Sequence, residues 1–188
     1  MRILLIENNH MMRRLVREML VGFGASLPNI VETDNVDDAI RSVYNSKFDI
    51  VICDFFLGDL DGGDFTRHIR GDESCPNRKI PILLITGSPD HHKVLKALES
   101  GVNEVLAKPL SPKILHFRIV SMITRPRPFV MTATYVGPSR GLQRQESISR
   151  LLASMQATEA RKWRNVESKV LRFRESINSD PDTKQYFL

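Results

Sequence analysis

Short apolar runs alternate with amphipathic stretches through the first two-thirds of the chain. Four of the runs are continuous, as expected of strands that are covered on both faces. They are Ile3–Ile6, Ile50–Cys53, Ile82–Ile85 and Val105–Ala107. A fifth, shorter run at residues 30–31 predicts one more strand.

Between these runs, apolar residues recur at helical spacing. Helices are predicted at residues 11–21, 35–45, around 65–69, at 90–99 and after Ser111, where Pro112 can take the first helical position. Five strands that alternate with five helices predict an α/β fold with a doubly wound, five-stranded parallel sheet. We expect this domain to cover residues 1–123.

The pattern changes after residue 123. Two prolines in Arg125-Pro126-Arg127-Pro128 cannot continue a helix, so residues 124–146 are expected to be a linker or an extended arm. Apolar residues then return at a coiled-coil period, which predicts a long amphipathic helix over residues 147–178. Residues 179–188 are expected to be frayed. Whether the helix packs on its own domain or on another chain stays open.

Charge is distributed unevenly along the chain. Residues 1–110 hold 13 Lys and Arg against 16 Asp and Glu, whereas residues 111–188 hold 14 against 6. The acidic front and basic back suggest two parts with different partners. Two cysteines without a ligand pattern exclude a disulfide framework and a zinc site. No apolar run approaches the roughly 18 residues that cross a bilayer, and no signal peptide is visible, so we expect a cytoplasmic protein.

Polar side chains follow four of the predicted strands. Glu7 and Asn8 come after the first strand, Asp54 after the third, Thr86 after the fourth and Lys108 after the fifth. In a doubly wound sheet, the carboxyl ends of the strands meet at one crevice. We therefore expect these five side chains to lie close together.

This set of groups suits phosphoryl transfer to a carboxylate. Asp54 is the candidate nucleophile, which would form an acyl phosphate. The transition state spreads negative charge over three oxygens, and a divalent cation and fixed donors stabilise it. Oxygens of Glu7, Asn8 and Asp54 can bind Mg2+. The hydroxyl of Thr86 and the ammonium of Lys108 can each bind a phosphoryl oxygen.

At these residues the chain resembles the receiver domain family of bacterial response regulators, which has the flavodoxin/CheY-like fold. The matching segments are Ile3–Asn8, Val51–Asp54 with Asp61-Gly62 downstream, Ile85–Gly87 and Ala107–Pro109. The resemblance implies two-component signal transduction, in which a histidine kinase or phosphotransfer protein phosphorylates Asp54 in the presence of Mg2+. It also implies that the backbone carbonyl of Phe56 binds the metal and that the Lys108–Pro109 peptide bond is cis.

The resemblance further implies that phosphorylation draws Thr86 inward and reshapes the face made by the fourth helix, fifth strand and fifth helix, a two-state switch. Three departures from the family pattern bear on this. Asn8 replaces an acidic residue, which predicts weaker Mg2+ binding. Val105 stands where an aromatic residue often rotates with the switch. Leu57-Gly58 replaces a common Met-Pro and loosens that loop.

The main interpretation is therefore a phosphoacceptor that signals through protein–protein contacts, with a downstream protein target and a homodimer through residues 147–178 as candidate partners. Two alternatives stay open: a regulator that binds nucleic acid through its basic tail, and a pseudo-receiver that acts without phosphate. Glu7 and Asn8 could also merely cap the first helix. Nothing resembles a nucleotide-binding loop or a nucleophile elbow, so an enzyme acting on a small molecule is not expected.

Overall fold

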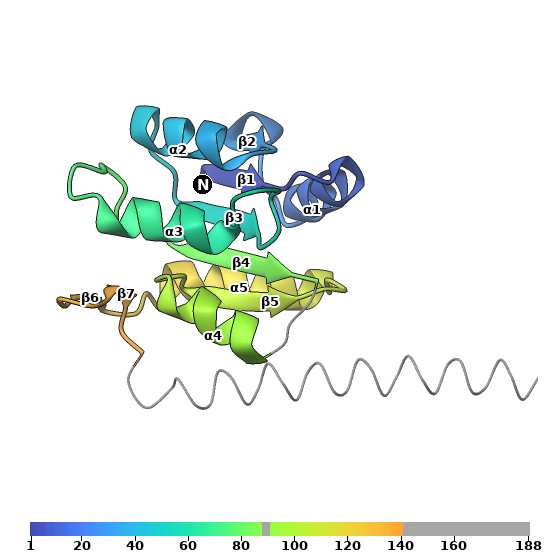
Figure 1. Cartoon of the computed structure of the whole chain (residues 1–188). Coiled ribbons are helices and arrows are strands. Elements are labelled where there is room, and N and C mark those ends of the chain that lie inside the picture. The colour runs from blue at the N-terminus through green and yellow to red at the C-terminus, as the bar shows by residue number, and fades with distance from the viewer. Residues whose placement is uncertain (88–90, 141–188) are drawn as a thin grey trace, which may run out of the picture. The chain divides into compact units, whose positions relative to one another are not determined.

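A five-stranded parallel sheet forms the centre of the protein. The computed structural model describes residues 1–87 and 91–140, and of residues 91–93 it describes the backbone only. The strands are arranged in the order β2-β1-β3-β4-β5 (Figure 1). Their bounds are β1 (Ile3–Ile6), β2 (Ile30–Thr33), β3 (Ile50–Asp54), β4 (Ile82–Thr86) and β5 (Glu104–Ala107). The predicted doubly wound α/β fold is confirmed.

Helices cover both faces of the sheet. They are α1 (His10–Gly22), α2 (Val36–Asn45), α3 (Gly62–Gly71), α4 (His91–Glu99) and α5 (Pro112–Thr124), with a short 3-10 helix at Leu27–Asn29. Helices α1 and α5 lie on one face, and α2, α3 and α4 lie on the other (Figure 1). This two-sided covering explains why the strands read as continuous apolar runs rather than as alternating patterns.

The core follows from the alternation of side chains along each strand. Ile3, Leu5 and Ile52 point to the face that α1 and α5 cover, where they pack with Leu20 and Ile119. In β1, β3 and β4 the intervening residues point to the opposite face and are equally buried. The strands are thus fixed from both sides, which gives their carboxyl ends a rigid base.

Three helices begin at a residue whose side chain caps them. The side chains of Asn9, Asn35 and Asp61 each accept a hydrogen bond from the backbone N–H three residues later. Each cap satisfies one of the donors that a helix start leaves unpaired. Helix α5 differs. Ser111 occupies the predicted cap position and Pro112 follows it, but the Ser111 side chain makes no capping hydrogen bond.

A small antiparallel hairpin follows α5, within the segment expected to be a linker or extended arm. Its strands are β6 (Phe129–Met131) and β7 (Val136–Pro138). Val130 pairs with Gly137 at its centre, and the backbone N–H of Thr132 donates to the carbonyl of Tyr135 across the turn, at 2.8 Å. The residue pattern did not predict this hairpin.

Some predictions concern residues outside the described part. The amphipathic helix at 147–178, the frayed tail at 179–188 and the last residues of the 124–146 segment are among them. Among the described residues, no helix is long and apolar enough to cross a membrane. The cytoplasmic location stays a prediction.

Candidate functional site

Four of the predicted site residues stand at the carboxyl-end edge of the sheet. Asp54 closes β3, Thr86 closes β4, and Glu7 and Lys108 directly follow β1 and β5. Strand register brings these ends level, because Asp54 pairs with Ile85, one residue before Thr86. The backbone N–H of Lys108 donates to the carbonyl of Thr86 at 2.8 Å. The Lys108–Pro109 peptide bond is cis, as the resemblance implies.

The side chains of Glu7, Asp54 and Lys108 meet in one place. The Nζ of Lys108 lies 3.0 Å from Oε2 of Glu7 and 3.2 Å from Oδ1 of Asp54. Both carboxylates are almost fully buried, with Glu7 exposed by 3% and Asp54 by 6%. A single ammonium therefore lies between two acids that are largely withdrawn from water.

The Asp54 carboxylate lies in an environment that is unfavourable for its charge. Burial raises the pKa of Asp54 above its ordinary value, and the negative charge of Glu7 raises that pKa further, although Lys108 opposes both effects. Oδ1 of Asp54 is buried, and the ammonium of Lys108 lies 3.2 Å from it. A buried carboxylate oxygen beside a cation is placed to bind a metal ion or to form a bond to phosphorus.

Glu7 is fixed by two further contacts. The backbone N–H of Asn9 donates to its Oε1 at 3.0 Å. Nη1 of Arg13 donates to its backbone carbonyl at 2.7 Å, while Nε of Arg13 lies 3.3 Å from Oε2 of Glu32. The sequence did not predict a role for Arg13. Its hydrogen bond to Glu7 is to a backbone carbonyl, and any residue could supply such a carbonyl.

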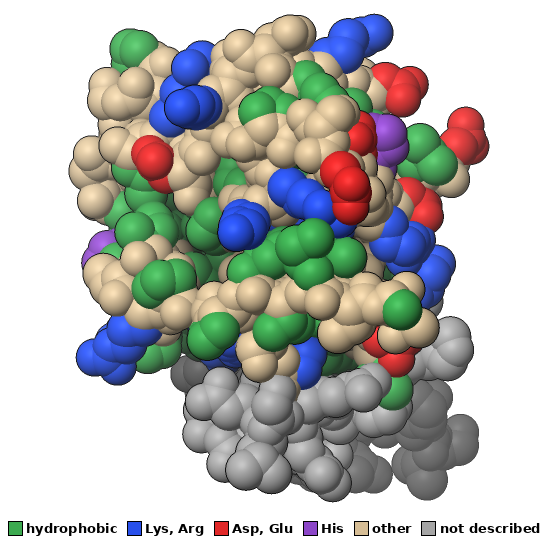
Figure 2. Space-filling view, turned by 90° about the vertical axis from the view of Figure 1, so that its left-hand side faces the viewer, with side chains coloured by type: hydrophobic (Ala, Val, Ile, Leu, Met, Phe, Trp, Pro, Cys, Tyr) green, Lys and Arg blue, Asp and Glu red, His purple; other side chains and the backbone are tan. Residues whose placement is uncertain are grey.

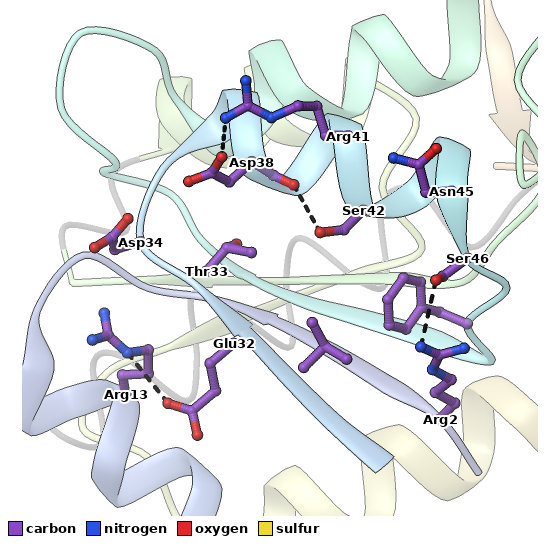
Figure 3. Close-up of a pocket in the computed structure, with 12 residues that line it drawn as sticks. Arg2, Arg13, Glu32, Thr33, Asp34, Asp38, Arg41, Ser42, Asn45 and Ser46 are labelled. Carbon is purple, nitrogen blue, oxygen red and sulfur yellow. Dashed lines mark hydrogen bonds and ion pairs between the residues drawn. The ribbon is translucent and has the colours of Figure 1, made fainter. Parts of the chain in front are cut away.

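A cavity of about 660 Å³ adjoins this support, between β2, α1 and α2. Figure 3 shows Arg13 reaching Glu32 and Arg41 reaching Asp38, so the cavity's charges are largely paired with one another. None of the predicted site residues lines it. The cavity is connected to the site through Arg13, which takes part in both.

The remaining predicted residues take less central positions. Thr86 is buried at the end of β4, whereas Asn8 is exposed beside Glu7. The Phe56 side chain is also exposed, with its ring centroid 5.0 Å from that of Phe55. The metal-binding and phosphoryl-binding roles of these three residues stay predictions.

The start of α3 packs closely against β3, the strand that ends at Asp54. A Cβ added at Gly62 would lie 2.5 Å from the backbone carbonyl oxygen of Asp54 and 2.9 Å from Sγ of Cys53. The backbone N–H of Gly62 donates to the carbonyl of Phe55 at 2.9 Å. Only glycine fits this approach, which gives a physical reason for the Asp61-Gly62 pair in the sequence. Asp61 itself is the cap of α3 and not a site residue.

The donor set can be compared with the needs of Mg2+. The described residues hold no group of three or more His, Cys, Asp or Glu that could bind a metal. Two carboxylates remain, those of Glu7 and Asp54, and they meet at the ammonium of Lys108. Because Mg2+ is often held by one or two carboxylates and keeps several waters, the residues fit this ion. Asn8 follows Glu7 directly in the sequence and supplies an amide rather than a third carboxylate.

Comparison with known proteins agrees with this geometry. Residues 3–120 match the model of the response regulator receiver domain. The chain belongs to the receiver domain family. Receiver domains are phosphoacceptor domains of two-component signalling.

The receiver resembles both curated relatives and solved structures. It is 26% identical over 125 residues to the chemotaxis protein CheY of Pseudomonas aeruginosa, a match that covers 66% of this chain and 98% of CheY. A response regulator structure from Chloroflexus aurantiacus superposes with a TM-score of 0.59 at 26% identity, covering 66% of this chain and 98% of the other.

A further structure bears on the metal. The receiver domain of the sensor histidine kinase PA1611 from Pseudomonas aeruginosa superposes with a TM-score of 0.57 at 30% identity, covering 65% of this chain and 95% of that domain. A magnesium ion is coordinated in its active site cleft.

Proposed function

We propose that Asp54 accepts a phosphoryl group from a phosphohistidine of a histidine kinase or phosphotransfer protein. The observation that carries the proposal is the buried Asp54 carboxylate, whose Oδ1 lies 3.2 Å from the ammonium of Lys108, which also pairs with Glu7. Burial raises the free energy of the charged carboxylate, and the adjacent ammonium can offset the charge of an incoming phosphoryl group.

The transfer replaces one bond to phosphorus by another. A carboxylate oxygen of Asp54 attacks the phosphorus atom, the P–N bond to the donor histidine breaks, and the imidazole nitrogen keeps the electron pair until it takes a proton from water. During the step the transferred group carries its negative charge on three oxygens, while the carboxylate gives up charge as its bond to phosphorus forms. The ammonium of Lys108 and the hydroxyl of Thr86 are the groups of this chain that stabilise that charge.

Mg2+ belongs to the same proposal. Glu7, Asp54, Asn8 and the backbone carbonyl of Phe56 would hold the ion, which neutralises charge on the carboxylates and on the transferred group. Because an amide at position 8 supplies an oxygen but no charge, we expect weaker Mg2+ binding than an acidic residue there would give.

The output is proposed to be a protein–protein interaction. The chain would catalyse only its own phosphorylation, and the phosphorylated form would present a changed surface to a downstream protein target. A homodimer through residues 147–178 remains a candidate, although that segment lies outside the described residues. Val105, buried in β5, does not provide an aromatic side chain for the switch.

Phosphorylation of the full chain by acetyl phosphate and Mg2+ tests the proposal. Intact mass measurement should show the addition of one phosphoryl group to the wild type and none to Asp54→Asn. Asp59→Asn is the matched control, because Asp59 is an exposed acid of the same loop. Phosphate uptake that persists in Asp54→Asn, or fails in the wild type at high Mg2+, contradicts the proposal.

One observation favours the pseudo-receiver as the second candidate. Asn8 removes a charge from the metal site, and Lys108 already bridges the two remaining carboxylates. Under this alternative, beryllofluoride and Mg2+ would leave the NMR spectrum of the full chain unchanged. Binding to nucleic acid through the tail stays a prediction, for which the test is a steep loss of binding with salt.

A further inference from the structure

The hairpin of β6 and β7 lies directly against the turn between α4 and β5. A Cβ added at Gly101 would lie 2.5 Å from the carbonyl oxygen of Val136, and one added at Gly137 would lie 2.8 Å from Cα of Gly101. Gly101 also has a φ of +96°, which favours glycine. The two backbones are therefore in contact, and neither position has room for a side chain.

Arg140 joins the hairpin to the end of α4. Its guanidinium donates to the backbone carbonyls of Leu98, at 2.9 Å, and of Val102. Nε donates to the hydroxyl of Tyr135 at 3.1 Å, and that hydroxyl donates to the carbonyl of Pro138 at 2.8 Å. A cation at the carboxyl end of a helix interacts favourably with the last carbonyls and with the negative end of the helix dipole. Arg140 is thus a cap for α4 supplied from another part of the chain.

The same helix is tied to the loop that leaves the acceptor. Nζ of Lys96 in α4 lies 3.1 Å from Oδ2 of Asp61. Asp61 ends the loop that begins after Asp54 and caps α3. Helix α4 is therefore held at one point by the acceptor loop and at its carboxyl end by the hairpin.

Other contacts fix the hairpin to parts of the protein that do not belong to α4. Arg127 donates to the carbonyl of Asn103 at 3.2 Å and pairs with Glu104 of β5. The Phe129 ring lies 5.4 Å from the guanidinium carbon of Arg70 and 5.9 Å from Nζ of Lys79.

The hairpin thus has one set of contacts with α4 and a second set with other elements, β5 among them. A shift of α4 relative to β5 must break one set or the other. Figure 2 looks onto the side of the molecule where the strands begin, and Lys and Arg side chains lie there beside hydrophobic ones.

We propose that residues 127–140 form a latch that is closed while Asp54 is unphosphorylated and opens when Asp54 carries a phosphoryl group. The inference rests on the proposed function. In this structure, Lys108 pairs with the free Asp54 carboxylate, Lys96 pairs with Asp61, and Arg140 caps α4. A phosphoryl group adds charge and volume beside the loop that ends at Asp61. When α4 follows that loop through Lys96, it moves away from Arg140, so the state of Asp54 is passed to residues 141–188, which begin directly after Arg140.

Hydrogen–deuterium exchange of the full chain tests the latch. Beryllofluoride with Mg2+ binds a carboxylate oxygen in place of a phosphoryl group and gives a stable analogue. It should speed exchange of hairpin amides, such as those of Thr132 and Ser139, by about fivefold or more, the lower end of common coupling factors between two sites. The same addition to Asp54→Asn should have no effect.

Variants at the two ties sharpen the test. Arg140→Ala should exchange quickly in the hairpin without beryllofluoride and, because coupling is reciprocal, should bind beryllofluoride about fivefold more tightly. Arg140→Lys, which keeps the charge but not the paired N–H groups, should lie between. Lys96→Met should keep the hairpin protected and make it insensitive to beryllofluoride. Arg125→Ala is the control, since Arg125 is exposed.

The outcomes separate the latch from the function on which it rests. Fluorine NMR reports whether beryllofluoride is bound to the protein. If it binds and hairpin exchange is unchanged or slower, the latch is wrong and the proposed function stands. If it does not bind at saturating Mg2+, the proposed function fails and the latch fails with it.

Discussion

The ammonium of Lys108 lies 3.0 Å from Oε2 of Glu7, a residue 101 positions away in the sequence. Nothing local brings these two side chains together. The contact exists because Glu7 follows β1 and Lys108 follows β5, and both strands end at the same edge of one parallel sheet. Strand β3, which ends in Asp54, also ends at this edge. The chemistry of the site is in this sense a product of the sheet order.

The environment of Asp54 predicts that its charged carboxylate lowers the free energy of unfolding. The pKa of Asp54 is higher in the folded protein than in the unfolded chain, so the folded state binds more protons between those two values. The contribution of protonated Asp54 to the free energy of unfolding is fully present below 3.8, its pKa in the unfolded chain. That contribution is lost as the pH rises through the higher pKa of the folded protein. At neutral pH the charged carboxylate therefore destabilises the fold.

Asp54→Asn should accordingly raise the free energy of unfolding at neutral pH by about 1 kcal/mol. The gain should shrink near pH 3, where Asp54 is largely protonated in both states. Urea unfolding at both pH values measures it, and Asp59→Asn should change stability by less than about 0.5 kcal/mol. A neutral-pH loss of stability in Asp54→Asn would show that Lys108 outweighs the burial of the charge.

Asn8→Asp should tighten Mg2+ binding by about tenfold or more, because one added charge near the ion is worth about 1–4 kcal/mol. Isothermal titration calorimetry measures the affinity. Asn9→Asp is the matched control: it adds the same charge one residue later, and aspartate preserves the cap of α1 that Asn9 supplies. Equal gains in the two variants would mean that position 8 has no special relation to the metal.

Arg13→Ala should slow phosphorylation by acetyl phosphate without abolishing it, because it frees the backbone of Glu7 but leaves Asp54 and Lys108 in place. The apparent Mg2+ affinity of the Arg13→Ala variant should fall by the same factor as its phosphorylation rate. Saturating Mg2+ should therefore restore much of that rate. Arg14→Ala is the control, since Arg14 is exposed and pairs only with Glu18 among the described residues. If Arg13→Ala behaves like Arg14→Ala, Arg13 has no positioning role.

Arg70 is expected to stabilise the fold. It is 2% exposed and donates to the carbonyls of Gly101 and Ile80, at 3.0 and 2.7 Å, and burial lowers its pKa to about 10. Arg70→Ala would leave these buried carbonyls unpaired and should cost about 3 kcal/mol or more in the free energy of unfolding. Arg67→Ala, at a largely exposed ion pair, should cost under about 1 kcal/mol. Thermal unfolding compares the two.

The sheet and the meeting of Glu7, Asp54 and Lys108 could be predicted from the sequence, because both follow from the periodicity of the strands. Continuous apolar runs mark strands covered on two faces, and the residues after them must gather where parallel strands end. The hairpin at 129–138 was not predicted, because strands of three residues are too short to show an alternation of apolar and polar positions.

The roles of Arg13, Arg70 and Arg140 were not predicted for another reason. Each donates to backbone carbonyls, at Glu7, at Gly101 and Ile80, and at Leu98. Every residue has such a carbonyl, so residue types do not indicate these contacts.

The central claim is that Asp54 becomes an acyl phosphate, and borohydride trapping tests it most directly. Borohydride reduces the activated carbonyl of an aspartyl phosphate, breaking its C–O bond to phosphate, and leaves free carboxylates untouched. After treatment with acetyl phosphate and Mg2+, peptide mass spectrometry should find homoserine at position 54, and only when acetyl phosphate was present. Homoserine at Asp59 or Asp61 instead, or at no position, would contradict the account.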